Sequence, residues 1–169
     1  MEDLCNRLAD DVDAAFPDLV ACVRDDLYSG LLRMHGAEAE DLAQETLIRA
    51  YRALRGYDAD RIRALRLRPW LWTIALNLGR NHARDQARRP RPVELEDRHP
   101  VSDPEPHDSV VWDGWLRRLP PAQRRAVVLR HVVDLSYADI AEITGRPEGT
   151  VKADVSRGLT KLRSIVEEP

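Results

Sequence analysis

Apolar side chains recur at spacings of three and four residues along most of this chain, and that spacing predicts helices. The pattern indicates two or three helices within residues 12–55, another over residues 70–87, and a further series from residue 110 onward. Aromatic residues make up 5% of the chain, whereas Leu, Ala and Arg are abundant. The sequence therefore predicts an all-α protein.

Residues 88–109 interrupt this pattern, because they are rich in proline and acidic residues and carry no apolar period. Such a segment is typical of a linker. We expect it to join two small helical domains, residues 1–87 and residues 110–169. Fully extended, it would span at most about 70 Å, which is enough to hold the two domains well apart.

Residues 135–163 have the pattern of a helix, a tight turn and a second helix, which is a helix-turn-helix. Ser136 can cap the first helix, with Asp139 three residues later as an imperfect capping box, and Gly145 ends that helix. Pro147 stands where the first turn of the second helix tolerates proline. The predicted apolar sides comprise Tyr137, Ile140, Ala141 and Ile143 in the first helix, and Val151, Val155, Leu159, Leu162 and Val166 in the second.

The opposite arc of the second helix carries small, hydroxylated and basic side chains, of the kind that let a helix enter the major groove of DNA. These are Thr150, Lys152, Ala153, Ser156, Arg157 and Thr160. We interpret the segment as a DNA-recognition helix. The competing interpretation is an amphipathic helix pair with basic residues, which is common in proteins that never touch DNA.

The helix predicted over residues 70–87 separates into two arcs at about 100° per residue. The apolar arc comprises Leu71, Trp72, Ile74, Ala75, Leu76 and Leu78, and the other comprises Trp70, Thr73, Asn77, Arg80, Asn81 and Arg84. An aromatic ring, amides and guanidinium groups on one face suit single-stranded DNA, which offers bases to stack and phosphates to neutralise. Alternatively, Trp70 packs at a domain edge and the arginines are merely solvated.

A polar cluster with spacing i, i+3 and i+4 lies on the helix predicted to end near residue 55. It comprises Asp41, Gln44 and Glu45. Such a cluster is either a solvated helix face or a docking surface. The following residues, 56–69, are dense in arginine, with turn-forming Gly56 and Asp58 and an expected break before Trp70.

The formal net charge is −3, from 26 Lys and Arg against 29 Asp and Glu. A net negative chain has little of the sequence-independent attraction for phosphate on which free-standing DNA-binding proteins rely. Something else must therefore bring this protein to DNA. The basic residues nevertheless cluster in residues 61–91 and 117–163, while acidic residues crowd the N-terminus and residues 94–108.

Residues with metal-binding or redox chemistry are few. Cys5 and Cys22 are too few and wrongly spaced for a zinc site or a disulfide framework. The five histidines form no metal-binding motif, so no metal, cofactor or catalytic residue is expected. No run of about twenty apolar residues is present, and the acidic N-terminus is unlike a signal peptide, so we expect a cytoplasmic protein.

The two-domain order, the proline-rich linker and the terminal helix-turn-helix together resemble the extracytoplasmic-function (ECF) sigma factors, the smallest group of bacterial RNA polymerase initiation subunits. Residues 41–54 are similar to the region two segment of that family, which binds the clamp coiled coil of polymerase. Residues 69–85 are similar to its promoter-melting helix, with Trp70, Leu71, Trp72, Ile74, Ala75 and Asn77 on motif positions. Residues 119–152 resemble region four, which reads the minus-35 element and touches the polymerase flap.

The resemblance implies a transcription initiation factor without catalytic activity, whose partners are core RNA polymerase, promoter DNA and, as in many relatives, an anti-sigma factor. It implies that Asp41, Gln44 and Glu45 contact polymerase. Thr150, Lys152, Ala153, Ser156 and Arg157 would read the minus-35 element. Arg61, Arg63, Trp70, Thr73, Asn77, Arg80, Asn81 and Arg84 would bind the minus-10 element. The acidic linker residues Glu94, Glu96, Asp97, Asp103 and Glu105 suit a segment that threads towards the active centre of polymerase.

Two positions depart from the family pattern. Asp154 stands where relatives commonly have a basic residue, and we expect it to pair with Lys161 or Arg157. The melting loop lacks the usual short pattern of glycine and serine before a phenylalanine and has arginine-rich residues 61–69 instead. The promoter sequence therefore does not follow from the family pattern.

Three other functions compete with the sigma-factor hypothesis. A stand-alone helix-turn-helix regulator would bind DNA tightly as a dimer without polymerase, which the net charge argues against. A hydrolase or metal enzyme would rest on His35, His82 or His131, which are far apart in the sequence. An adaptor would bind polymerase or another sigma factor without melting DNA.

Overall fold

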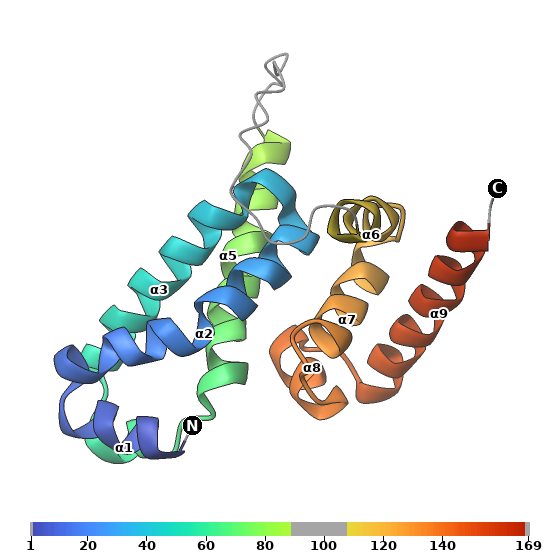
Figure 1. Ribbon diagram of the computed structural model, residues 1–169. Coiled ribbons are helices and arrows are strands. Elements are labelled where there is room, and N and C mark those ends of the chain that lie inside the picture. The colour runs from blue at the N-terminus through green and yellow to red at the C-terminus, as the bar shows by residue number, and fades with distance from the viewer. Residues whose placement is uncertain (1, 89–107, 168–169) are drawn as a thin grey trace.

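A computed structural model describes residues 2–88 and 108–167, and every regular element within those residues is a helix. In chain order the elements are α1 (Glu2–Asp10), α2 (Val12–His35), the 3-10 turn η1 (Gly36–Glu38), α3 (Ala39–Gly56), α4 (Ala59–Arg63), α5 (Leu67–Arg88), α6 (Asp108–Arg117), α7 (Pro121–His131), α8 (Tyr137–Thr144) and α9 (Glu148–Glu167). Helices α1–α5 form one group and α6–α9 another, beside it (Figure 1). The acidic linker residues predicted to thread into polymerase lie outside the described residues.

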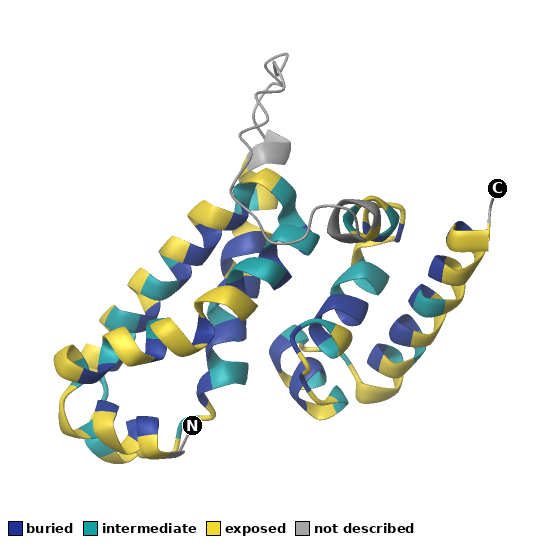
Figure 2. Ribbon diagram, in the orientation of Figure 1, coloured by how far each residue is buried: buried dark blue, intermediate teal, exposed yellow. Residues whose placement is uncertain are grey.

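The first domain is built on α2, α3 and α5, with α3 contacting both of the others. Its core contains Leu19, Leu27, Leu54 and Trp72, each at most 2% exposed, and the buried sides of these helices face one another (Figure 2). The apolar arc predicted for α5 is confirmed: all its members are buried except Ile74, which is half-buried. Fully burying a side chain of this size contributes roughly 1.5–3 kcal/mol, so this arc holds the domain together.

The predicted element boundaries of the first domain need three corrections. The break expected before Trp70 is wrong, because α5 begins at Leu67 with Pro69 in its first turn, where the missing N–H costs no hydrogen bond. Helix α1 was not predicted, although its Leu4, Cys5 and Leu8 are buried against the domain. The arginine-rich segment contains the short helix α4, whose N-cap Asp58 accepts a 2.8 Å hydrogen bond from the backbone N–H of Arg61.

The second domain confirms the predicted helix-turn-helix. The capping box of α8 is complete, because the Ser136 hydroxyl accepts from the Asp139 N–H at 3.0 Å and the Asp139 carboxylate accepts from the Ser136 N–H. Gly145 ends α8 with a φ of 66°, a left-handed conformation that favours glycine. The predicted apolar stripe of α9 is wrong at its end: Val166 is 50% exposed and Ile165 is buried, since the stripe steps by three residues after Leu162.

The two domains pack against each other, although the linker is long enough to separate them. Helix α8 contacts α5, and both α6 and α7 contact α2. One close contact is at Gly30 of α2, where an added Cβ would lie 2.5 Å from the Trp72 ring and 3.0 Å from Val133 of the second domain. Only glycine leaves room for both side chains, so the cores of the two domains are continuous at this point.

Candidate DNA-binding and polymerase-binding surfaces

Helix α9 presents the predicted DNA-recognition residues on one side. Its other side packs on α7 and α8, so that Val151, Val155 and Leu162 are buried. We define the recognition face as Thr150, Lys152, Ala153, Ser156 and Arg157. Lys152, Ser156 and Arg157 are exposed, and Thr150 and Ala153 are half-buried. The structure therefore brings all five predicted residues together, on a helix that lies on the far side of the second domain from the first (Figure 1).

Lys152 is held in place by two neighbours at the start of the recognition face. Its ammonium group lies 2.7 Å from the Glu148 carboxylate and 5.6 Å from the centre of the Tyr137 ring. The hydrogen bond to Glu148 and the charge of that carboxylate raise the pKa of Lys152, and Tyr137 contributes in the same direction. Lys152 therefore keeps its positive charge, as a contact to DNA phosphate requires.

Asp154, the residue that departs from the family pattern, is a buried anchor for two arginines. Its side chain is 4% exposed, and one carboxylate oxygen accepts a 2.8 Å hydrogen bond from Arg157 while the other pairs with Arg146. The predicted pairing with Arg157 is confirmed. The pairing with Arg146 was not predicted, because that residue lies in the turn between α8 and α9 and not on the helix of Asp154. Asp154 therefore fixes the position of Arg157 within the recognition face.

Helix α5 carries a row of polar side chains on the side away from its core. We define the α5 row as the six predicted residues Trp70, Thr73, Asn77, Arg80, Asn81 and Arg84. The last four are exposed and pair along the helix, Arg80 with the amide oxygen of Asn77 and Arg84 with that of Asn81 at 3.0 Å. Thr73 is half-buried and donates to the Pro69 carbonyl at 3.0 Å. Amide N–H groups and guanidinium groups thus alternate along an open surface.

An aromatic cluster lies beside the first turn of the α5 row. The rings of Trp70 and Tyr57 meet edge to face with their centroids 6.2 Å apart, and the Arg61 guanidinium lies 3.6 Å from the centre of the Tyr57 ring. Stacking of Arg61 on this ring is a cation–π contact. Tyr57 was not predicted as part of the site, although it lies within the arginine-dense residues 56–69. Arg63 instead pairs with Asp10 at 3.0 Å and with Asp60, which ties it to α1 and α4.

Helix α3 presents the predicted polar cluster to solvent with one apolar residue in addition. Asp41 and Gln44 are exposed, and Glu45 is half-buried with a 2.7 Å ion pair to Arg49. Ile48, which the sequence pattern placed among the apolar positions of this helix, is 44% exposed and continues the cluster by one turn. We define the α3 surface as Asp41, Gln44, Glu45 and Ile48.

Comparison with known proteins connects these three surfaces. The family Sigma-70 region 2 matches residues 19–89, and the family Sigma-70, region 4 matches residues 115–162. The chain is 33% identical over 177 residues to the ECF RNA polymerase sigma factor SigW of Bacillus subtilis, an alignment that covers 91% of this chain and 90% of that protein. This chain belongs to the ECF sigma factors. It is an alternative sigma factor for promoter-directed transcription initiation.

A second relative and a solved structure agree with this assignment. The RNA polymerase sigma factor CarQ of Myxococcus xanthus is 34% identical, over 96% of this sigma factor and 95% of CarQ. The sigma factor RpoE of Bartonella quintana, solved in complex with the anti-sigma factor NepR, matches with a TM-score of 0.74 at 26% identity. That alignment covers 90% of this chain and 97% of RpoE. Both the sequence and the fold are therefore those of the family.

In this sigma factor a polar clasp joins the two domains at the start of the α5 row. Arg66, one turn before Trp70, pairs with Asp139 of α8 and lies 3.6 Å from Glu142. Burial alone would raise the pKa of Asp139, but hydrogen bonds from Ser136 and Arg66 outweigh it and lower that pKa. A second ion pair, 3.6 Å between Arg33 of α2 and Asp113 of α6, also crosses the boundary. We call this contact between the two domains the docked arrangement. It is held by these ion pairs as well as by Trp72 and Val133.

The histidines and cysteines do not gather into a metal site within the described residues. His82 lies 3.1 Å from Glu38, His35 packs on Gly79, and His131 is exposed on α7. Cys5 is buried and Cys22 is exposed, and neither forms a disulfide. Among residues 2–88 and 108–167, no helix is both long enough and apolar enough to cross a membrane.

Proposed function

We propose that this sigma factor binds core RNA polymerase through the α3 surface and promoter DNA through the α5 row and the recognition face. It acts in the cytoplasm and has no catalytic activity of its own. The observation that carries the proposal is the recognition face: five side chains of groove-entering type point away from a helix whose other side is core. Each good bidentate contact to a base would contribute about 1–3 kcal/mol of discrimination, which sets the register on the minus-35 element.

The α5 row and the Tyr57–Arg61 pair supply what extruded minus-10 bases need. Unstacking costs a few kcal/mol per base, and stacking on an aromatic side chain returns about 1–3 kcal/mol. Trp70 and Tyr57 offer rings, Asn77 and Asn81 offer amides, and Arg61 offers a cation beside the rings. The α3 surface supplies the polymerase contact that a chain of net charge −3 needs in order to reach DNA.

Transcription in vitro tests this proposal directly. The protein is added to bacterial core polymerase on fragmented genomic DNA, and transcript starts are sequenced. We expect discrete new starts that share two spaced upstream motifs. The double variant Trp70→Ala, Asn77→Ala should still copurify with polymerase but lose at least about tenfold of the starts, the effect of about 1.4 kcal/mol of lost stabilisation. Arg24→Ala, an exposed change on α2, is the matched control and should keep them.

Each competing function predicts a different result in the same assay. A stand-alone regulator would give no new starts and would bind DNA equally well without polymerase. An adaptor would bind polymerase, and replacing Trp70 and Asn77 would change nothing. Either result would overturn the proposal.

The proposal includes an anti-sigma partner, because the RpoE structure that matches this chain holds an anti-sigma factor. Such a partner would bind the docked arrangement and keep the α5 row from polymerase-bound promoter DNA. Pull-down from native extract, with and without stress, should recover a second protein besides polymerase. Recovery of polymerase alone under all conditions would contradict this part.

A further inference from the structure

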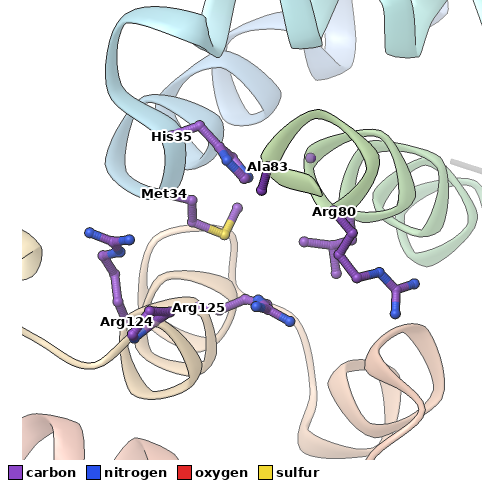
Figure 3. Close-up of a pocket in the computed structure, with 9 residues that line it drawn as sticks. Met34, His35, Arg80, Ala83, Arg124 and Arg125 are labelled. Atoms are coloured by element: carbon purple, nitrogen blue, oxygen red, sulfur yellow. The ribbon is translucent and has the colours of Figure 1, made fainter. Parts of the chain in front are cut away.

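A cavity of about 250 Å³ lies at the boundary between the two domains. Three arginines and a histidine line it: His35 of α2, Arg80 of α5, and Arg124 and Arg125 of α7 (Figure 3). Met34 and Leu76 form its apolar floor. The cavity shares only Arg80 with the α5 row and has no residue in common with the α3 surface or the recognition face.

Glu38 acts on the His35 side of this cavity, where its charge raises the pKa of His35, but the arginines have no paired acid in the part of the chain that the structure describes. No carboxylate there forms an ion pair with Arg80, Arg124 or Arg125. Arg124 and Arg125 are half-buried. Burial lowers the pKa of both, and nearby arginines lower it further, Arg117 in the case of Arg124 and Arg80, Arg146 and Arg124 in the case of Arg125. Crowded guanidinium groups without an acid are stabilised by an anion.

Helix α7 adds to the positive potential, since its first residue, Pro121, also lines the cavity. The positive end of the α7 dipole therefore lies at the same cavity that Arg124 and Arg125 line. Guanidinium groups bind phosphate oxygens two at a time, and several of them around one site match the several charges of a polyphosphate. A lone carboxylate would satisfy only one of these arginines.

We propose that this interdomain pocket binds a phosphate-bearing small molecule of the nucleoside phosphate class. The phosphates contact Arg80, Arg124 and Arg125, and the base lies over Met34, Leu76 and the His35 ring. A volume of about 250 Å³ is below the range of about 300–1,000 Å³ that is usual for small-ligand pockets, so part of the bound molecule would lie outside the cavity. The inference depends on the docked arrangement of the domains and not on the proposed function.

The ligand would also favour the docked arrangement. Arg80 belongs to the first domain and Arg124 and Arg125 belong to the second, so the complete site exists only when the domains are in contact. A ligand that binds only one state of an equilibrium shifts the population towards that state. Binding should therefore hold the α5 row beside the second domain.

Isothermal titration calorimetry of the full chain at constant ionic strength tests the pocket, with inorganic pyrophosphate, ATP and GTP as probes. We expect saturable binding with one site per chain. The double variant Arg124→Gln, Arg125→Gln should bind at least about tenfold more weakly, whereas the control Arg52→Gln, which removes an exposed charge on α3, should bind within about twofold of the wild type. Should the double variant fail to fold, Arg80→Gln, which is exposed on the other domain, tests the same contact and should bind several-fold more weakly.

Fluorescence transfer tests the coupling to docking. One dye on the exposed Cys22 and another on Ser164→Cys in α9 report the separation of the domains, while Cys5 is buried. A bound probe should raise the transfer efficiency of the wild type and should leave the transfer efficiency of Arg124→Gln, Arg125→Gln unchanged. Tighter binding of ATP than of pyrophosphate would confirm the nucleoside part.

Four results would overturn the proposal. The first is that no probe shows saturable binding. The second is that Arg52→Gln weakens probe binding as much as the double variant does, which would indicate that overall charge, not the cavity, controls binding. The third is binding without a change in transfer efficiency. The fourth is equal binding of pyrophosphate and ATP, which would show that the base makes no contact in the cavity and would overturn the assignment to the nucleoside phosphate class. None of them depends on whether the protein initiates transcription.

Discussion

The recognition face and the α5 row are both candidate DNA-binding surfaces, but they differ in what lies beside them. The recognition face is supported by its own domain, through α7, α8 and the buried Asp154, and lies on the far side of that domain. The α5 row begins at Trp70, one turn after Arg66, which is bound to the other domain. The difference teaches that the recognition face is held by its own domain alone, whereas the first turn of the α5 row lies beside the contact between the domains.

The strength of docking follows from the kind of contacts that hold it. The Arg66 side chain is 63% exposed, and exposed ion pairs contribute only about 0–1 kcal/mol. The second ion pair, between Arg33 and Asp113, is less exposed, with side chains 22% and 16% exposed. Apolar residues of both domains also join one core, to which the contact at Gly30, Trp72 and Val133 belongs. The predictions that follow act on one surface and leave the other unchanged.

Asp154→Ala should have the largest effect, and only on the recognition face. It removes the shared partner of Arg146, whose side chain is 35% exposed, and of Arg157, whose side chain is 59% exposed. Because both guanidinium groups can reach water, the expected loss is about 1–2 kcal/mol in the free energy of unfolding of the second domain. Urea denaturation measures that loss, and footprinting on a promoter measures the weakened contact near Arg157.

The control for this prediction is Asp154→Asn, which keeps the shape and one acceptor oxygen and should lose less stability. Transfer between dyes on Cys22 and Ser164→Cys should be the same in both variants and in the wild type. A loss of docking in Asp154→Ala would show that the two surfaces are not independent.

The contacts that the sequence predicted are local ones. The capping box joins Ser136 and Asp139, three residues apart, and the pair of Asp154 with Arg157 has the same spacing. Helical geometry fixes such distances before any tertiary contact forms. The buried and exposed arcs of α5 also follow from the helix period alone. This is why the recognition face and the α5 row could be predicted residue by residue.

The contacts that the sequence did not predict depend on packing between distant segments. Arg66 meets Asp139 across 73 positions of sequence, and nothing in a helical wheel brings them together. Ile48 fitted the apolar period of its helix but is 44% exposed among the residues that the structure describes. Helix α1 was missed because its acidic residues hid the spacing of Leu4 and Leu8. Domain docking and the cavity at the domain boundary could not be predicted either, because both depend on packing between segments that are distant in the sequence.

Arg66→Gln should have a smaller effect, and only on docking. It removes the clasp to Asp139 and Glu142, so we expect a shift of at most about 1 kcal/mol towards separated domains, or roughly fivefold in the equilibrium. Lower transfer efficiency between the dyes on Cys22 and Ser164→Cys measures this shift. The free energy of unfolding of each domain, measured by urea denaturation, should be nearly unchanged. The matched control is Arg63→Gln, because Arg63 pairs with Asp10 and Asp60 inside the first domain. An equal shift in that variant would mean that charge, not the clasp, controls docking.

The smallest expected effect is a pH dependence of docking through His35. Burial lowers the pKa of His35. The charges of Arg125, Arg124 and His82 lower this pKa further, whereas the charge of Glu38 raises it. A folded pKa below the ordinary value of about 6.5 means that the neutral ring is favoured in the docked state. The contribution of His35 to the stability of the docked state is therefore present above about pH 6.5 and is lost as the pH falls below that value.

The two arginines belong to the second domain, so they act on His35 only when the domains are docked, and acid should favour separation. Lowering the pH from about 7.5 to about 5.5 should reduce the transfer efficiency of the labelled protein by less than Arg66→Gln does. His35→Gln should respond less to pH over that range. The lowered pKa of Asp139 places its protonation at more acidic pH, so the clasp stays charged throughout. If His35→Gln kept the full response, His35 would not be the group responsible, and its contacts with Arg124 and Arg125 would not explain the pH dependence of docking.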